Sequence, residues 1–171
     1  MRLPLGFLAS GVAAGIKRSS QPDLALLYAP SPLAWALVTT QNLVKAPFIS
    51  RNRALYDSDR PVRAVVVNSG NANCATGDEG AHDNEVFAAQ AATTLKVARE
   101  EVVTASTGIV GERLPVARIL ARLPSLKQGL AEGAEAAAKA IMTTDTRPKL
   151  AEAKLPGGAR IVGIAKGSGM I

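Results

Sequence analysis

RAVVVN, residues 63–68, is the strongest indication of the fold class, because its three consecutive valines precede the segment NSGNANCATGDEG, residues 68–80. A short run of β-branched residues is typical of a strand that is buried on both faces of a sheet. The glycines and asparagines that follow favour irregular backbone. Asp83 is then expected to cap a helix that continues to about Val97. A buried strand followed by a helix predicts an α/β fold.

The segments on either side continue this alternation. Strands are predicted over residues 23–28, 34–40, 102–106 and 160–165, and helices over residues 115–123 and 130–142. Pro30 and Pro32 are expected to form a turn between the first two of these strands. No repeat or low-complexity linker divides the 171 residues.

Composition excludes several classes of protein. One Cys and one His can form neither an internal disulfide nor a Cys/His zinc site, so a cytoplasmic chain without a metal is expected. No apolar run approaches the roughly 18 residues of a membrane-spanning helix, and Pro4 and Gly6 interrupt the only stretch that resembles a signal peptide. The net charge is +6, but the basic residues are scattered and the aromatics are only one Trp, two Tyr and three Phe, so no nucleic-acid surface is predicted.

The common catalytic pairs are also missing. His82 is expected in a solvated polar loop, and Cys74 is expected to be a buried structural thiol. The chain has neither a GxxxxGK[ST] loop nor a GxGxxG after a strand, so no nucleotide cofactor is predicted. An acyl-transfer enzyme of this sequence would need a nucleophile that is activated without histidine.

Three short segments carry chemical interest. Thr107 and Gly108 end a predicted strand, where a hydroxyl and a backbone N–H could stabilise an oxyanion. The segment TTDT, residues 143–146, offers hydroxyls to a polar ligand, although an ordinary capping turn explains it equally well. Lys166 lies between small residues and could bind a carboxylate, although most lysines are simply solvated.

Six motifs occur along the chain in one order. They are GFLASGVAAGIK (6–17), PDLALL (22–27), NSGNANCATGDEG (68–80), STGIVGERLP (106–115), AIMTTDTRPK (140–149) and GIAKGSGMI (163–171). Together they closely resemble the ornithine acetyltransferases, or glutamate N-acetyltransferases, of arginine biosynthesis. The resemblance extends from Gly6 to Ile171. One departure is Cys74-Ala75, where the family is expected to have Ala-Cys, and we interpret it as a neutral exchange of small residues.

The resemblance implies an enzyme made of two chains. In that family a precursor cuts itself into an α chain and a β chain, and the β chain begins with the nucleophilic threonine. Residues 1–171 would be the α-chain portion, and the nucleophile would be absent from this sequence. The implied fold is a layered sandwich of mixed sheets and helices of the ornithine acetyltransferase/DmpA-like type, completed by the β chain, and the implied assembly is an α2β2 heterotetramer.

The resemblance also assigns roles to individual residues. Thr107 and Gly108 match the pair that forms the oxyanion hole. Thr143 matches a substrate-binding threonine, with Thr144 as the alternative for that position, and Lys166 matches a substrate-binding lysine. The implied reaction moves acetyl from N-acetylornithine to glutamate through an acyl-enzyme, with ping-pong kinetics and no resident cofactor. Acetyl-CoA is implied only as a further possible substrate.

Two alternatives stay open on the sequence. A self-cleaving amidohydrolase or aminopeptidase of a related fold would pass the acyl group to water instead of glutamate. A basic, non-catalytic binding domain would be stable and monodisperse without a partner chain. The first is distinguished by the fate of the acetyl group, and the second by the behaviour of the isolated chain.

Overall fold

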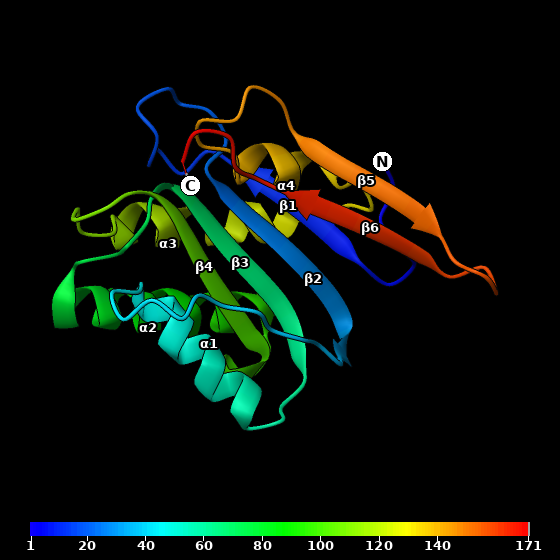
Figure 1. Cartoon of the computed structure of the whole chain (residues 1–171), viewed down its shortest axis with the longest axis horizontal. Helices are drawn as coiled ribbons and strands as arrows, with labels where there is room; N and C mark the ends of the chain where they lie inside the picture. The colour runs from blue at the N-terminus through cyan, green and yellow to red at the C-terminus, as the bar shows by residue number, and fades with distance from the viewer. Residues whose placement is uncertain (171) are drawn as a thin grey trace.

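The computed structural model describes residues 1–170, so Ile171, the last residue of the sixth motif, lies outside the described residues. The elements in chain order are β1 (Leu8–Val12), β2 (Leu24–Leu33), α1 (Pro47–Asp57), β3 (Val62–Asn71), α2 (Gly77–Leu95), the short 3-10 helix η1 (Arg99–Glu101), β4 (Val102–Ile109), α3 (Val116–Gln128), α4 (Glu135–Ala140), β5 (Lys149–Lys154) and β6 (Arg160–Ala165). Figure 1 shows them arranged in layers around a central sheet.

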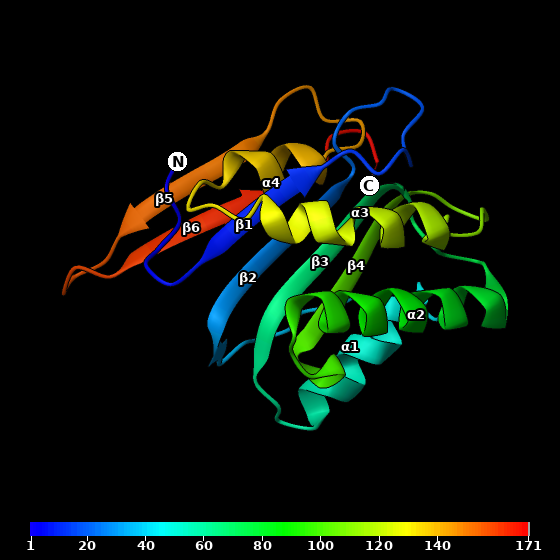
Figure 2. The ribbon, with the colours of Figure 1, turned by 180° about the vertical axis from the view of Figure 1, so that it is seen from behind.

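The central sheet has four strands in the order β1-β2-β3-β4. β2 is antiparallel to both β1 and β3, whereas β3 and β4 are parallel and are connected through α2. Figure 2 shows α2 and α3 in front of this sheet. A separate antiparallel hairpin, β5-β6, lies along the β1 side of the sheet (Figure 1).

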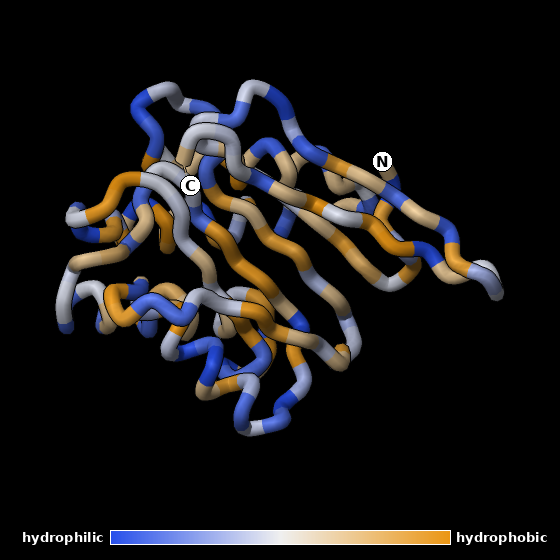
Figure 3. Tube along the Cα trace, in the orientation of Figure 1, coloured by the Kyte–Doolittle hydropathy of each residue, from blue (hydrophilic) through white to orange (hydrophobic). Residues whose placement is uncertain are grey.

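Alternation along the strands divides the core into two apolar layers, because successive side chains of a strand point to opposite faces. Leu24, Leu26 and Val66 belong to the layer that packs on Phe87 of α2 and Ile119 of α3. The other layer is small and alanine-rich, and Leu150, Val162 and Ile164 of the hairpin pack against it. Its buried members are Leu3, Ala9, Ala25, Ala134, Ala137 and Ala140. Figure 3 shows the apolar stretches along β2 and β3 that supply both layers. The layered α/β class predicted from the sequence is confirmed.

The strand predicted over residues 34–40 is wrong. β2 continues through both prolines to Leu33, and residues 34–46 form no regular element. Trp35 packs edge-on against Tyr56 of α1 and donates its indole N–H to the carbonyl oxygen of Arg60. Val38 is almost fully exposed, so the apolar residues of this segment are not those of a buried strand.

Other boundaries moved because of tertiary contacts. α2 begins at Gly77, so Asp83 is not its cap but lies inside the helix and pairs with Arg113. The helix predicted over residues 130–142 is shortened to α4, because Ala131 forms a β-bridge with Ala9. β3 extends into the segment that was expected to be irregular and ends at Asn71. β1, α1 and β5 were not predicted.

Candidate functional site

The site begins where β3 and β4 end. Because the two strands are parallel, their carboxyl ends lie at the same edge of the sheet, and the pairing places Ser69 beside Thr107 and Gly70 beside Gly108. The Thr107–Gly108 pair predicted from the sequence therefore lies directly against the NSGN segment of β3.

Glycine is required at both of these paired positions. Gly108 has φ +139°, and a Cβ atom there would lie 2.3 Å from the Gly70 carbonyl carbon and 2.5 Å from the Asn71 nitrogen. Gly70 has φ +101°, a conformation that side chains rarely adopt. The close approach of the two backbones thus fixes where Thr107 is held.

Buried asparagines brace this edge of the sheet. Ser106 Oγ donates to Asn68 Oδ1 at 2.6 Å, and Asn68 Nδ2 donates to the Asn71 carbonyl oxygen at 2.8 Å. Asn71 Nδ2 in turn donates to the carbonyl oxygens of Glu112 and Arg113. These bonds satisfy buried polar groups within the backbone turns, so the asparagine side chains fix the backbone at this edge of the sheet.

Lys166 joins the predicted site residues. Its Nζ donates to Thr107 Oγ1 at 2.9 Å and to Thr143 Oγ1 at 2.7 Å, although the two threonines lie 59 and 23 residues away in the sequence. Three segments, at the end of β4, after α4 and after β6, therefore meet at one ammonium group. Thr144 is not part of this contact, because its exposed side chain accepts the backbone N–H of Gly169 at 3.2 Å.

This contact sets the direction of the two hydroxyl protons. A threonine oxygen that accepts from an ammonium group must direct its own proton to another acceptor. The Thr107 and Thr143 hydroxyls are thus available as donors to a ligand oxygen next to Lys166. A cation behind two hydroxyl donors is suited to an anionic or carbonyl oxygen.

Asp145, to which the sequence assigned no role, anchors the same loop. Its fully buried carboxylate accepts the Thr143 N–H at 3.1 Å, the Gly167 N–H at 2.7 Å and the Lys149 ammonium. The hydrogen bond from Lys149 holds the pKa of Asp145 well below its usual range, because it outweighs the opposing effect of burial, and the two backbone N–H bonds act in the same direction as Lys149. The i,i+4 spacing of Asp145 and Lys149 was the only sequence signal for this pair.

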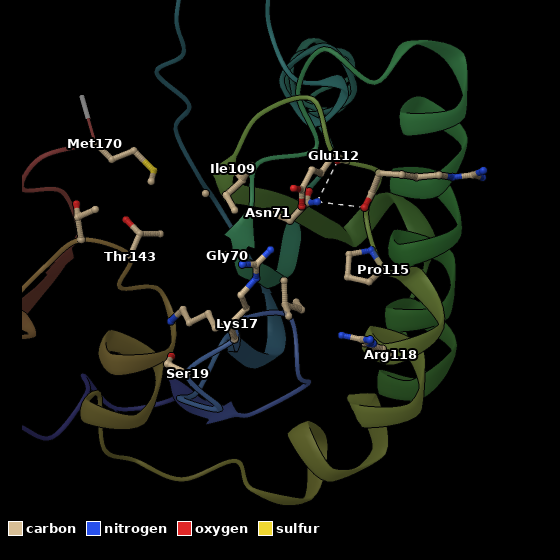
Figure 4. Close-up of a pocket in the computed structure, with 15 residues that line it drawn as sticks. Lys17, Ser19, Gly70, Asn71, Ile109, Glu112, Pro115, Arg118, Thr143 and Met170 are labelled. Carbon is tan, nitrogen blue, oxygen red and sulfur yellow. Dashed lines mark hydrogen bonds between the residues drawn. The ribbon is translucent and has the colours of Figure 1, made fainter.

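A cavity of about 570 Å³ opens beside these groups. Figure 4 shows that Lys17, Gly70, Arg118 and Thr143 surround it, and Gly108 is also in its lining. Burial lowers the pKa of Lys17, and the nearby Lys166 charge lowers it further. The loop that carries Lys17 is held by Asp23, another residue without a predicted role. Its buried carboxylate accepts the backbone N–H groups of Ala14, Ile16 and Lys17.

In the described part of the chain, the remaining sequence candidates are not hydrogen-bond partners of Lys166. His82 is exposed on α2, so it is solvated but not in a loop, and Cys74 is half-buried rather than buried. Within residues 1–170, no three His, Cys, Asp or Glu side chains gather in a way that could hold a metal ion. In the same part of the chain, no helix is long and apolar enough to span a membrane.

The profile of one protein family matches residues 8–171 of the chain. The chain belongs to the ArgJ family. It is 58% identical over 171 residues to the arginine biosynthesis bifunctional protein ArgJ of Thermus thermophilus, and 50% identical over 168 residues to the protein of that name from Deinococcus radiodurans. These alignments cover 100% and 98% of this chain but only 44% and 43% of the relatives, so the chain spans less than half their length.

Solved structures agree with this ArgJ assignment. The ornithine acetyltransferase of Mycobacterium tuberculosis, solved in complex with ornithine, superposes with a TM-score of 0.93 at 39% identity, covering 98% of this chain and 91% of that one. The arginine biosynthesis bifunctional protein ArgJ of Bacillus halodurans superposes with a TM-score of 0.91 at 35% identity, covering 98% and 90%. The family resemblance and the fold type expected from the six motifs are both confirmed.

Proposed function

We propose that this chain is the α portion of a glutamate N-acetyltransferase that moves acetyl from N2-acetyl-L-ornithine to L-glutamate in arginine biosynthesis. The observation that carries the proposal is the Lys166 ammonium, which donates to the hydroxyls of both Thr107 and Thr143. Thr107 directly precedes Gly108, and Gly108 and Thr143 line the open cavity. The names of the ArgJ relatives and the ornithine complex of the M. tuberculosis protein support the choice of substrates.

In this proposal Thr107 and Gly108 form the oxyanion hole. Negative charge develops on the acetyl carbonyl oxygen during acyl transfer, and donors already in place stabilise it without reorganisation. The Thr107 hydroxyl proton points away from Lys166, and the Lys166 charge makes that hydroxyl a stronger donor. The Gly108 backbone N–H supplies the second donor.

Thr143 and Lys166 bind the substrate. Both substrates carry an α-carboxylate, and a hydroxyl beside an ammonium group matches that shared feature. Both Thr143 and Thr144 line the cavity, but Thr143 is preferred for this role because its hydroxyl contacts Lys166, whereas the Thr144 hydroxyl accepts the backbone N–H of Gly169.

The nucleophile belongs to a β chain released from the same precursor. Its N-terminal threonine oxygen attacks the acetyl carbonyl, the C–N bond to ornithine breaks, and the threonine's own α-amine takes the hydroxyl proton and passes it to the departing amine. The amine of glutamate then attacks the acetyl ester, and the threonine hydroxyl is regenerated. Two half-reactions on one nucleophile give ping-pong kinetics. The coverage figures are consistent with a separate β chain, because the chain matches 44% of a curated relative but 91% of a solved chain.

Three finer points belong to the same proposal. The functional assembly is an α2β2 heterotetramer, and the reaction needs no resident cofactor. Acetyl-CoA serves as a second acetyl donor, which agrees with the word "bifunctional" in the relatives' names. A hydrolase of the same fold would instead release acetate.

The test uses the full-length precursor. Intact-mass and N-terminal analysis is expected to show two fragments, the second beginning with threonine. Incubated with N-acetylornithine labelled in the acetyl group, the enzyme is expected to form labelled N-acetylglutamate when glutamate is present and little acetate. An uncut chain, or label that appears as acetate regardless of glutamate, would contradict the proposal.

A further inference from the structure

We infer that Asp145 is a positioning residue that holds Thr143 and Lys166 in working register, an inference that rests on the proposed function. One carboxylate oxygen accepts the N–H of Thr143 at 3.1 Å, and the other accepts the N–H of Gly167, the residue after Lys166, at 2.7 Å. Asp145 thus bonds to the backbone of both segments that carry the proposed substrate-binding groups.

The hydrogen bonds of Asp145 connect the two ends of the β5-β6 hairpin. After Asp145 the backbone runs out along β5 and returns along β6, so Gly167 meets Asp145 across a separation of 22 residues. The far end of this hairpin is exposed, and its strands pair only with each other in the described sheets. Together with the packing of Leu150, Val162 and Ile164 on the core, the contacts at the base of the hairpin determine where Lys166 lies relative to Thr143.

Neighbouring hydrogen bonds join the same two segments. Thr144 Oγ1 accepts the N–H of Gly169 at 3.2 Å, and the Lys149 ammonium donates to the Gly167 carbonyl oxygen as well as to Asp145. The loop of residues 143–145 consequently holds residues 166–169 at several successive points, and Asp145 is the member whose side chain has no solvent exposure.

A carboxylate is needed here because three donors converge on it. An ionised carboxylate only accepts, whereas an asparagine amide would turn two N–H donors toward groups that are themselves donors. Asp145→Asn therefore keeps the volume of the side chain but breaks the bond to at least one of the two segments. The segment that is released carries Thr143 or Lys166 with it.

The ion pair allows positioning to be separated from stability. Lys149 is 39% exposed and Asp145 is 0% exposed. Asp145→Asn leaves an ammonium group that water can solvate. Lys149→Met leaves a buried carboxylate without its counter-ion, which is the more destabilising loss, but it keeps both backbone N–H bonds. If Asp145 positions the site, activity and stability must fall in opposite order in these two variants.

The experiment uses the full-length, self-cleaved enzyme and three variants. D145N and K149M break the same ion pair, and Glu152→Gln is the matched control, because its pair with Arg160, 3.0 Å long, lies on the same hairpin away from Thr143 and Lys166. We measure kcat and KM for N-acetylornithine and glutamate together with Tm. D145N is expected to lose about 10²-fold in kcat/KM for both substrates, the effect of a misplacement of about 1 Å, with a Tm no lower than that of K149M. The kcat/KM of K149M is expected to be at least about tenfold higher than that of D145N. The kcat/KM of E152Q is expected to equal that of the wild type.

Each outcome has a defined meaning. If activity falls in the same order as Tm, the pair is only stabilising and the inference is overturned. K149M is informative even if D145N fails to assemble, because a K149M loss as large as about 10²-fold would show that the ammonium, and not the two N–H bonds, holds the site. A wild-type enzyme that does not acetylate glutamate overturns the proposed function itself, whereas an active wild type with an equally active D145N overturns only the role of Asp145.

Discussion

Replacing the Thr107 hydroxyl is the most direct perturbation of the site. Thr107→Val keeps the shape of the side chain and removes the oxygen that accepts the Lys166 ammonium at 2.9 Å. The loss should be confined to this contact, because the backbone pairing of Thr107 with Ser69 does not involve the side chain.

The expected effect on stability is small and the effect on rate is large. Lys166 is only partly buried and keeps its bond to Thr143, so the hydrogen bond that is lost contributes about 1 kcal/mol to folding. Loss of one oxyanion donor lowers kcat by about 10²–10³, equivalent to roughly 2.7–4 kcal/mol of transition-state stabilisation. A loss of transition-state stabilisation that exceeds the loss of folding stability distinguishes a catalytic hydroxyl from a structural one.

The assay follows formation of N-acetylglutamate by the assembled enzyme, with thermal unfolding measured in parallel. Thr107→Ser restores a hydroxyl and should stay within about tenfold of the wild type, since it loses one methyl group of about 0.8 kcal/mol. Thr93→Val is the matched control, because it removes a hydroxyl from the exposed face of α2 that bonds only its own helix.

The oxyanion role of Thr107 would be refuted by a Thr107→Val enzyme whose kcat stays within about threefold of the wild type, far short of the expected loss. It would also be refuted if the Thr107→Ser enzyme were as slow as the valine variant. In that case the shape of the side chain, and not its hydroxyl, would be what the reaction needs.

Three further perturbations follow from the geometry. Gly108→Ala should destabilise the protein by about 2–6 kcal/mol in urea unfolding, because it adds backbone strain to a collision with Gly70, whereas Gly157→Ala, which has a positive φ but nothing within 4 Å, should show the strain alone. Lys166→Met should raise KM for both substrates by about ten- to a hundredfold, and unchanged kinetics would make the lysine a bystander. The lowered pKa of Asp145 means that its contribution to stability is fully present above about pH 4 and is lost as the pH falls toward that lowered pKa. The Tm difference between wild type and D145N should therefore shrink on acidification. A difference that grows would contradict a stabilising role of the ionised Asp145 carboxylate.

The site was predictable from the sequence only as separate pieces. The Thr107–Gly108 pair, the TTDT segment and Lys166 were each weak candidates, and the family resemblance alone gave reason to treat them together. Their meeting at one ammonium group depends on how β4, α4 and β6 pack. Asp145 had no signal strong enough to be selected, because its backbone partners can be known only after the chain has folded.

Local sequence determined the elements whose signal is strong over a few residues. The valines of residues 63–68 and of residues 102–106 predicted β3 and β4, the parallel pair of the sheet, because β-branched residues favour buried extended backbone wherever they occur together. Tertiary structure decided what depends on distant partners: the start of α2 ahead of Asp83, which pairs with Arg113, the irregular path of residues 34–46, and the cluster around Lys166. The physical reason is the separation along the chain over which each interaction acts. Backbone preference and side-chain alternation act between near neighbours, whereas a hydrogen bond across 59 residues exists only when packing has brought its two ends together.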